Sequence, residues 1–236
     1  MADYSENKDR FFGRRKGRKL NKGRHEALRL LDQIGISQKE VLEKKDQSIT
    51  SEDLFTKHPD ELWLEVGFGN GDLLAELHRK YPNIGFIGAE PFINGVSALL
   101  KNVKRDNLGN LRIWPDDVRL LLQKLQPATL NRIYVLNPDP WPKRKHHKRR
   151  FISPENLNLL SGLLKTDGEI LMTTDVDGLA EWMAIQISRH PDFMLNVSNP
   201  DQMKTMPENW IPSRYETKGQ MAGRSQYYIP ASKISK

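Results

Sequence analysis

Residues 61–72 read Glu-Leu-Trp-Leu-Glu-Val-Gly-Phe-Gly-Asn-Gly-Asp, an apolar strand pattern that runs directly into three alternating glycines. Glycine adopts positive φ without steric cost and lets backbone amides come close to a ligand. A helical pattern follows near 72–80, and a second strand pattern follows at 84–88. This order predicts the first unit of a parallel α/β sheet, with a ligand site at the glycine turn.

The alternation of strand and helix continues along the chain. Strand patterns occur at 62–66, 84–88, 111–114, 132–136, 169–173, 193–197 and 226–229. Helical patterns lie near 72–80, 92–104, 117–125, 154–165 and 178–189. Strict alternation predicts a doubly wound, mostly parallel sheet covered on both faces. It fails between the last two strands, where the helical pattern is weak.

Two segments precede the sheet domain, which we place at 55–236. Residues 1–24 are rich in Lys, Arg, Gly and Asn, so we expect a flexible basic arm. Residues 25–54 form an extension, in which Leu28, Leu31 and Ile34 have helical spacing up to Gly35. A linker near 54–59 then leads into the first strand.

The composition excludes several classes of site. The 236 residues contain no cysteine, which rules out disulfides, thiolate metal sites and a cysteine nucleophile. No apolar run reaches the roughly 20 residues of a membrane span, and no apolar signal core follows the basic N-terminus. We therefore expect a soluble, cytoplasmic protein without a membrane partner.

The net charge of +7 is concentrated in two segments. Residues 1–24 hold nine Lys or Arg and three acids, and residues 143–150 hold six Lys or Arg and no acid. The remaining chain has a net charge of −5. An acidic body with two concentrated basic segments is typical of a protein that binds a phosphate polymer. A solvated basic tail without a partner is the alternative for residues 1–24.

Carboxylates follow the first three predicted strands. Glu65 and Asp72 flank the glycine turn, and Glu90 lies nineteen residues after Gly71, where it can accept two hydrogen bonds from a ribose diol. Asp116 and Asp117 follow the third strand, where they are placed to reach an adenine edge. Dinucleotide and triphosphate loops need residues that this turn lacks. The acidic surroundings suit a ligand with positive charge.

Residues 137–150 read Asn-Pro-Asp-Pro-Trp-Pro-Lys-Arg-Lys-His-His-Lys-Arg-Arg. The prolines favour a stiff, non-helical turn that offers Trp141 as a stacking face and Asp139 as an acceptor. The cations that follow suit phosphates. The segment predicts a site for a flat base beside a phosphate chain. A proline turn leading into a solvated basic surface remains the alternative.

Two motifs carry a resemblance to a known family. The Glu-x-Gly-x-Gly-x-Gly turn with a strand-end Glu resembles the S-adenosylmethionine pocket of seven-stranded class I methyltransferases, whose last two strands form an antiparallel edge. The second motif resembles the signature of bacterial tRNA (guanine-N7)-methyltransferases. It matches at Pro138, Asp139, Pro140, Trp141, Lys143, His146, Lys148, Arg149 and Arg150. Ser213-Arg214-Tyr215-Glu216 is similar to the family's Thr-Lys-Phe-Glu, with three substitutions.

The resemblance implies methyl transfer from S-adenosylmethionine to a variable-loop guanine of tRNA, guanine 46. The cofactor-binding candidates are Glu65, Gly67, Gly69, Gly71, Glu90, Asp117 and Asp139, with Asp139 also catalytic. The substrate-binding candidates are Trp141, Lys143, Asp175, Ser213, Arg214, Tyr215 and Glu216. The RNA-binding candidates are Lys145, His146, His147, Lys148, Arg149 and Arg150. For Asp175 a helix cap is the alternative, and Glu216 can instead pair with Lys218 or Arg214.

Ring nitrogen 7 of guanine carries a free lone pair, so its methylation requires no general base. Two other functions remain open. An amino-group methyltransferase uses a loop that residues 137–141 resemble loosely, although Asp139 interrupts the fit. A non-catalytic RNA-binding protein with this fold would lack cofactor affinity. We predict no metal, since His146 and His147 have no carboxylate company. We predict no obligatory protein partner, and a monomer or homodimer.

Overall fold

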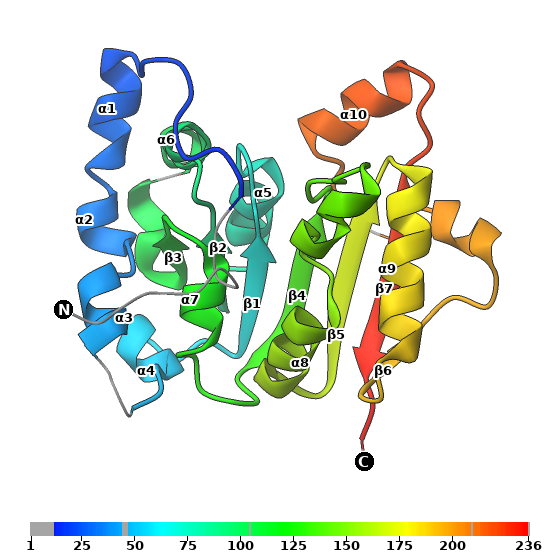
Figure 1. Cartoon of the computed structure of the whole chain (residues 1–236). Coiled ribbons are helices and arrows are strands. Elements are labelled where there is room, and N and C mark those ends of the chain that lie inside the picture. Colours follow the sequence, from blue (N-terminus) through cyan, green and yellow to red (C-terminus); the bar gives the residue numbers. More distant parts are fainter. Residues whose placement is uncertain (1–11, 44–46, 104, 209, 236) are drawn as a thin grey trace.

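The computed structural model describes residues 12–43, 47–103, 105–208 and 210–235. A seven-stranded sheet with the order β3-β2-β1-β4-β5-β7-β6 forms its centre (Figure 1). The strands are β1 (Glu61–Val66), β2 (Ile84–Ala89), β3 (Leu111–Trp114), β4 (Leu130–Leu136), β5 (Leu164–Thr174), β6 (Phe193–Leu195) and β7 (Tyr227–Lys233). The first five strands are parallel, and β7 is antiparallel to both β5 and β6. This confirms the predicted doubly wound sheet with an antiparallel C-terminal edge.

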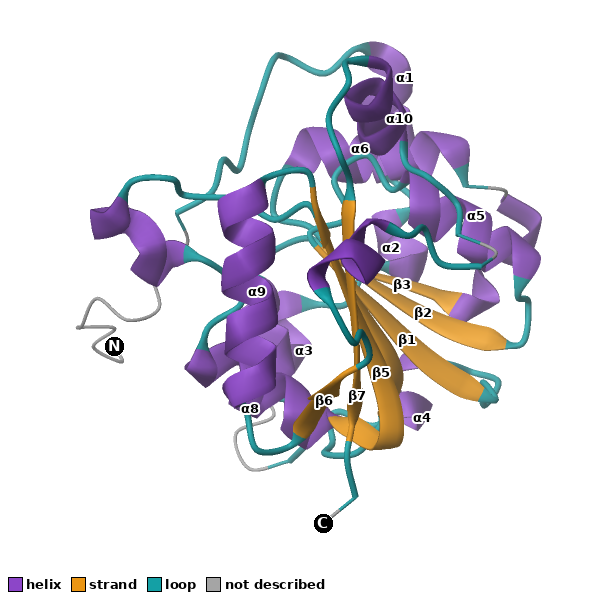
Figure 2. Cartoon of the chain, turned by 90° about the vertical axis from the view of Figure 1, so that its right-hand side faces the viewer, coloured by secondary structure: helices purple, strands orange, loops and turns teal. Residues whose placement is uncertain are grey.

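Helices cover both faces of the sheet (Figure 2). They are α1 (Lys22–Leu28), α2 (Leu31–Ile34), α3 (Gln38–Glu43), α4 (Ser51–Leu54), α5 (Asp72–Lys80), α6 (Ile93–Asn102), α7 (Val118–Leu122), α8 (Pro154–Leu163), α9 (Asp177–Arg189) and α10 (Arg214–Met221). The described residues also form the 3₁₀ helices η1 (Arg105–Asn110), η2 (Arg144–Arg149) and η3 (Pro200–Lys204). None of the helices in the described ranges is long and apolar enough to cross a membrane.

Successive residues of a strand enter two different cores. In β1, Leu64 packs with the core beneath α7, α8 and α9, whereas Trp63 packs with the core beneath α1, α5 and α6. Tyr134 of β4 joins the second core, and its neighbours Ile133 and Val135 join the first. Side chains alternate across a strand, so a sheet buried on both faces needs the near-continuous apolar runs seen in the sequence.

The register of the central strands brings their carboxyl ends level. Val66 at the end of β1 pairs with Ala89 of β2 and with Val135 of β4, and Ala89 pairs with Trp114 of β3. The strand order reverses at β1, which lies between β2 and β4. The loops after β1, β2, β3 and β4 therefore meet at one edge, where open α/β sheets bind ligands.

The structure corrects several predicted boundaries. Strand β5 begins at Leu164 rather than 169, because Leu164 pairs with Leu130 before a register irregularity. Helix α4, which is held by a capping box between Thr50 and Asp53, lies at the end of the predicted extension and overlaps the predicted linker only at Leu54. Helix α10 was not predicted, because its apolar spacing is poor, although Ser213 caps it by accepting from the Glu216 amide. Residues 1–11 of the predicted arm lie outside the described residues. Helix α1 begins at Lys22, within the last three residues of that arm.

Candidate functional site

The glycine turn between β1 and α5 is built from left-handed backbone. Gly67, Gly69 and Gly71 have φ of 70°, 57° and 72°. A Cβ on Gly71 would lie 2.6 Å from the Leu99 side chain, so this glycine allows α5 and α6 to pack closely. A Cβ on Gly67 or Gly69 would meet no protein atom within 4 Å. The turn therefore leaves open space above its first two glycines, as a ligand-binding turn requires.

Glu65 is a buried carboxylate beside this turn. The residue is 4% exposed, and its Oε2 atom is buried without a hydrogen-bond partner. Burial, reinforced by the nearby charges of Glu90 and Asp72, raises the pKa of Glu65 to about 8. A buried polar atom without a partner is rare and costs free energy. This atom is therefore available to accept a hydrogen bond from a bound ligand.

Glu90 holds the same turn in place. Its Oε2 accepts from the Gly69 amide at 2.7 Å, and its Oε1 accepts from the Phe92 amide at 2.8 Å. Burial raises the pKa of Glu90, and the charge of Asp139 raises it further, while the two amides act in the opposite direction. The effect of Asp139 on this pKa links the turn after β4 electrostatically to the carboxylates after β1 and β2.

The raised pKa of Glu65 predicts a pH-dependent stability. The unfolded chain releases this proton near 4.5, whereas the folded chain keeps it to about 8. The contribution of Glu65 to folding is therefore fully present below pH 4.5, and it declines by at most about 1.4 kcal/mol per pH unit up to pH 8. Glu65→Gln removes this decline. We expect the free energy of unfolding of the variant, relative to that of the wild type, to increase as pH rises from 5 to 8.

Urea denaturation of both proteins at pH 5, 6.5 and 8 measures the difference. Glu76→Gln is the matched control, because Glu76 is a half-exposed residue of α5 that pairs only with Arg79 among the interactions described. A constant difference between wild type and Glu65→Gln across these pH values would contradict a neutral, buried Glu65.

The two carboxylates after β3 have different partners. Asp117 caps α7 by accepting from the Arg119 amide at 3.1 Å, and it also forms an ion pair with the Arg119 guanidinium at 2.5 Å. Asp116 accepts from Arg15 at 2.6 Å and from the side-chain amide of Gln38. The structure thus gives Asp117 a local partner and turns Asp116 towards the N-terminal segment.

The turn after β4 presents Asp139. Asn137 and Trp141 have φ of 46° and 42°, an unusual conformation for residues other than glycine. Gln226 donates to the Asn137 side-chain oxygen at 3.0 Å, and the Asn137 amide donates to the Thr173 carbonyl at 2.9 Å. These contacts hold the turn while the Asp139 side chain remains exposed. Strain of this kind clusters at functional sites.

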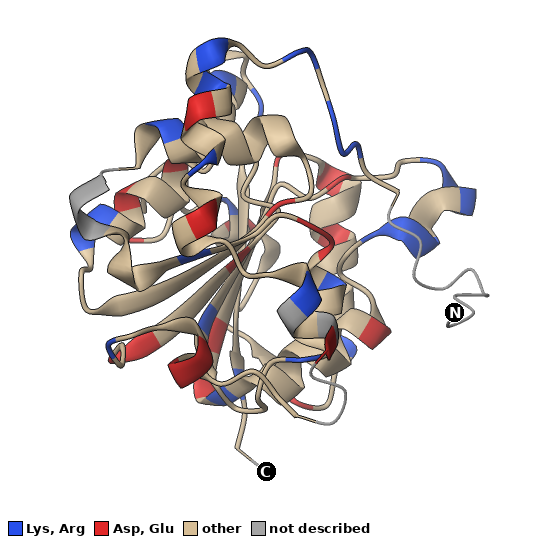
Figure 3. Ribbon diagram, turned by 90° about the vertical axis from the view of Figure 1, so that its left-hand side faces the viewer, with Lys and Arg blue, Asp and Glu red and all other residues tan. Residues whose placement is uncertain are grey.

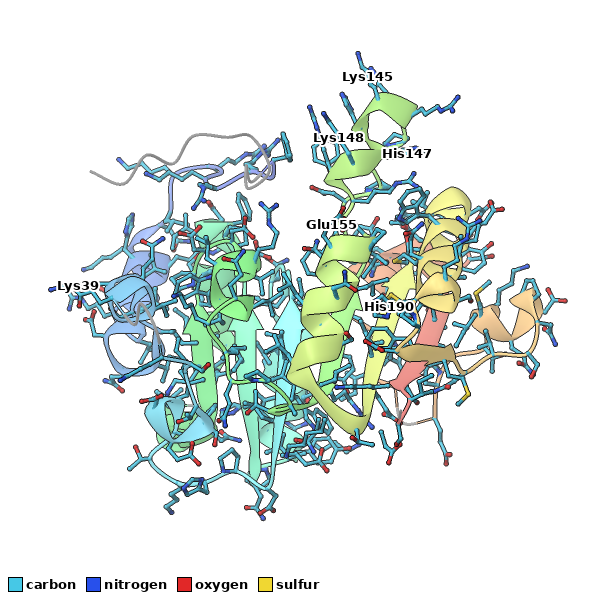
Figure 4. The ribbon with its side chains drawn as sticks, turned by 60° about the horizontal axis from the view of Figure 1, so that its bottom comes forward. Lys39, Lys145, His147, Lys148, Glu155 and His190 are labelled. Carbon is cyan, nitrogen blue, oxygen red and sulfur yellow. The ribbon has the colours of Figure 1, made fainter. Side chains whose placement is uncertain are left out.

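The basic run divides into inward and outward side chains. Arg150 is buried, donates to the Pro140 carbonyl at 2.9 Å and lies over the Trp182 ring. The Arg149 guanidinium carbon lies 4.9 Å from the centre of the Trp141 ring. Lys145 and Lys148 are exposed and project away from the body (Figure 4). The inward pair, Arg149 and Arg150, braces the turn after β4, whereas the sequence predicts only RNA contacts for these two residues.

The candidate histidines lie on the same 3₁₀ helix. His146 contacts the Trp141 ring edge to face, with ring centres 5.8 Å apart, and loss of hydration lowers its pKa, as do the charges of the surrounding cations. His147 contacts the Trp182 ring at 5.6 Å. Lys143 precedes the helix and is exposed. The helix therefore rests on tryptophans and presents its lysines outward.

The segment after β5 forms a charged cluster with α10. Asp175, whose side chain is 5% exposed, forms an ion pair with Arg224 at 2.5 Å and accepts from the Tyr215 hydroxyl at 3.2 Å. Val176 occupies the N-cap position of α9, so the alternative role predicted for Asp175, that of a helix cap, is wrong. The Arg224 guanidinium also lies over the Tyr215 ring. Arg224 was missed, because no motif surrounds it.

The other members of the 213–216 segment have structural contacts. Glu216 is buried, accepts from the Trp210 indole at 3.0 Å and accepts from the Tyr228 hydroxyl. It pairs with neither Lys218 nor Arg214 in these interactions. Arg214 lies 3.5 Å from Asp72, in a cavity of about 220 Å³ that adjoins the glycine turn. Glu216 thus fixes α10 to the sheet, and Arg214 faces the turn.

Together these residues fit a specific kind of ligand. The open glycine turn and the unpartnered Glu65 oxygen suit a ligand that donates hydrogen bonds and carries positive charge. Figure 3 shows acidic ribbon segments where the strands converge, with the described basic segment that precedes α1 passing beside them. The sequence predicted the meeting of Glu65, Glu90 and Asp139 at one edge, but not the ion pair between Arg15 and Asp116.

Comparisons with known proteins agree with this geometry. A family model described as "putative methyltransferase" matches residues 59–229. The tRNA (guanine-N(7)-)-methyltransferase of Rhodospirillum rubrum is 37% identical over 229 residues, covering 93% of this chain and 86% of the relative. The corresponding protein of Paramagnetospirillum magneticum is 40% identical over 225 residues, covering 92% of this chain and 93% of the relative.

A likeness among solved structures supports the fold alone. The structure of a SAM-dependent O-methyltransferase from Thermotoga maritima aligns with a TM-score of 0.50 at 15% identity, covering 84% of this chain and 71% of that chain. The two relatives, at well over 30% identity across most of their length, decide the family. The chain belongs to the tRNA (guanine-N(7)-)-methyltransferase family.

Proposed function

We propose that the protein transfers a methyl group from S-adenosylmethionine to ring nitrogen 7 of guanine 46 in the variable loop of tRNA. The observation that carries the proposal is the meeting, at one sheet edge, of the acidic glycine turn with the turn that presents Asp139 and Trp141. The names of the relatives supply the reaction class and the RNA. Guanine 46 and the methyl donor are our inferences.

The cofactor would be held by the residues around the glycine turn. We assign Glu65 and the open faces of Gly67 and Gly69 to its positively charged end, and Glu90 to its ribose hydroxyls. We assign Asp117 to the adenine end of the site, where its carboxylate is paired with Arg119. When bound, the cofactor supplies an electrophilic methyl group on a sulfonium centre.

The chain then has to align the guanine and stabilise charge on it. Nitrogen 7 attacks with its own lone pair, so no side chain removes a proton, and alignment can lower a barrier by about 7–11 kcal/mol. Asp139 would accept hydrogen bonds from guanine and stabilise the cationic ring that forms. Trp141 offers a stacking surface beside it. The strained backbone at Asn137 and Trp141 would fix both groups before the RNA arrives.

The segment around α10 supplies further candidate contacts to the substrate nucleotide. Tyr215 is half exposed and is held by Asp175 and Arg224, so it can contact a nucleotide from a fixed position. Lys143, Ser213 and Arg214 remain candidates for phosphate or sugar contacts. Glu216 would act through the position of α10, since its carboxylate is already engaged by Trp210 and Tyr228.

The outward cations predict the salt dependence of tRNA binding. Lys145 and Lys148 are exposed and have no acid beside them in the sequence. If each neutralises one phosphate, the combined variant Lys145→Ala/Lys148→Ala should reduce the slope of log affinity against log salt by roughly 2. Filter binding between 50 and 200 mM salt measures that slope.

Lys57→Ala/Lys165→Ala is the matched control for this experiment. Both lysines are exposed and lie near the amino ends of β1 and β5, away from the site. The control should keep the wild-type slope. An unchanged slope in the Lys145/Lys148 variant would contradict the assignment of η2 to the RNA backbone.

An exocyclic amino group of a base is the rival target. Enzymes of that kind direct the oxygen of an Asn side chain at amine protons. Here the Asn137 oxygen accepts from Gln226 instead, and a carboxylate follows at Asp139. This arrangement favours a ring nitrogen that needs no proton acceptor. A non-catalytic RNA-binding role is disfavoured by the chain's membership of an enzyme family.

The decisive experiment incubates the protein with methyl-labelled S-adenosylmethionine and unmodified tRNA, and then identifies the labelled nucleoside. We expect 7-methylguanosine. A label on an exocyclic amine would identify the rival reaction, and tRNA binding without any transfer of label would contradict the proposed activity.

A further inference from the structure

The segment 12–18, called the strap below, lies across the ligand-binding edge of the sheet. It runs from α1 over the loops that follow the parallel strands, as the blue trace in Figure 1 shows. Its composition predicted only a flexible arm that meets RNA. The structure instead gives the strap specific contacts with three elements of the proposed cofactor and substrate sites.

The first contact is at the end of β3. The Arg15 guanidinium lies 2.6 Å from the Asp116 carboxylate. The Asp116 side chain is 12% exposed, whereas that of Arg15 is 52% exposed, so the arginine reaches inward from the surface. Asp116 also accepts from the Asp117 amide at 2.7 Å. The strap is thus attached beside Asp117, at the end of the site that we assign to adenine.

The second contact is with residues 92–94, shortly after Glu90. The Ile93 amide donates to the Arg15 carbonyl at 3.1 Å. Asn94 both accepts from the Gly17 amide at 2.8 Å and donates to the Arg18 carbonyl at 2.7 Å. A Cβ on Gly17 would lie 2.8 Å from the Phe92 ring, so glycine allows the close approach. Backbone hydrogen bonds hold the strap as an added element over the start of α6.

The third contact is with the turn after β4. The Phe12 and Trp141 rings meet edge to face, with centres 6.3 Å apart. The Arg149 guanidinium lies over both rings, 4.4 Å from the centre of Phe12 and 4.9 Å from that of Trp141. The strap therefore spans the distance from the end of β3 to the turn that presents Asp139.

We propose that the strap closes over the bound cofactor and that Arg15 is the positioning residue that fastens it to Asp116. This rests on the proposed function, since it assumes that S-adenosylmethionine occupies the glycine-turn site. The cofactor then leaves only when the strap lifts. Loosening the strap should act mainly on the rate of dissociation, as most changes in the strength of an interface do.

Arg15→Ala tests the proposal without RNA, so that lost tRNA contacts have no influence. In the full-length protein we expect the dissociation constant for S-adenosylmethionine, measured by calorimetry, to rise about fivefold, the upper range for a partly exposed ion pair. The dissociation rate, measured by displacement, should rise by the same factor. Arg15→Lys should recover part of the loss, because it restores the charge.

Arg14→Ala is the matched control, because Arg14 is the exposed neighbouring cation on the same segment. It should leave both constants at their wild-type values. Asn94→Ala loosens the strap at a second place without changing its charge and should also accelerate dissociation. Combining Arg15→Ala with Asp116→Asn should add little to either change alone, since both remove the same ion pair.

Limited trypsin digestion supplies a readout that does not depend on affinity. Cleavage after Arg14, Arg15, Lys16 and Arg18 should slow when S-adenosylmethionine is present, and the protection should weaken in Asn94→Ala. Suppose that calorimetry detects cofactor binding, that cleavage is equal with and without the cofactor, and that Arg15→Ala binds it like the wild type. These results would contradict the proposed role of the strap and leave the proposed function intact. No cofactor binding by the wild type would overturn both.

Discussion

Asp139→Asn should lower the rate constant of methyl transfer by about 10²–10³-fold, the usual loss when one stabilising group at a developing charge is removed. The substitution keeps the size of the side chain and one hydrogen-bond acceptor, but it removes the charge that would stabilise the methylated ring. Because Asp139 is exposed, we expect the substitution to leave folding intact, so a loss of rate would not come from a folding defect. Single-turnover assays with saturating tRNA and S-adenosylmethionine measure the step directly.

Asp167→Asn is the matched control for this substitution. Asp167 is an exposed residue of β5 with φ of 61°, a conformation that Asn also tolerates, so the same chemical change occurs away from the site. It should transfer methyl groups at the wild-type rate. A wild-type rate in Asp139→Asn would contradict electrostatic stabilisation by this carboxylate, whatever its role in binding.

Glu90→Ala should raise the dissociation constant for S-adenosylmethionine by about 10²-fold. Hydrogen bonds to a charged group contribute about 1.5–3 kcal/mol each, and we assign the ribose hydroxyls to this carboxylate. The substitution also leaves the Gly69 and Phe92 amides without their acceptor, which loosens the turn. Calorimetric titration of each protein with the cofactor gives the change.

Glu76→Ala serves as the control for Glu90→Ala, because the half-exposed Glu76 of α5 pairs with Arg79 and not with the glycine turn in the interactions described. Glu90→Gln separates the two effects of the alanine variant, since the amide oxygen can still accept from one of the backbone amides. We expect intermediate affinity for this variant. Wild-type affinity in Glu90→Ala would remove Glu90 from the cofactor site.

The sheet could be predicted because its signals are local. Apolar runs of strand length, a glycine turn and helical spacing lie within a few residues of one another, as in β1 and α5. Their alternation gives the parallel order, which in turn brings Glu65 and Glu90 to one edge. Helix α10 lacks such a signal, since only its Ser213 cap distinguishes it from a loop.

The contacts that complete the site could not be read from local patterns. Arg15 and Asp116 are separated by 101 positions, and Gln226 and Asn137 by 89. The direction of Arg149 and Arg150 depends on Trp141, Pro140 and Trp182, so the basic run resembled a uniform RNA-binding surface. Such choices arise from tertiary packing, where a charged side chain can bury its stem against aromatic rings.

The measurement that tests the account most directly uses tRNA in which guanine 46 is replaced by 7-deazaguanine. This base has a carbon in place of nitrogen 7 and keeps the exocyclic amine. With unmodified tRNA we expect one methyl group to be transferred per molecule, and with the 7-deaza tRNA none, at similar tRNA affinity. Undiminished transfer to the 7-deaza tRNA would contradict methylation of nitrogen 7 at this position.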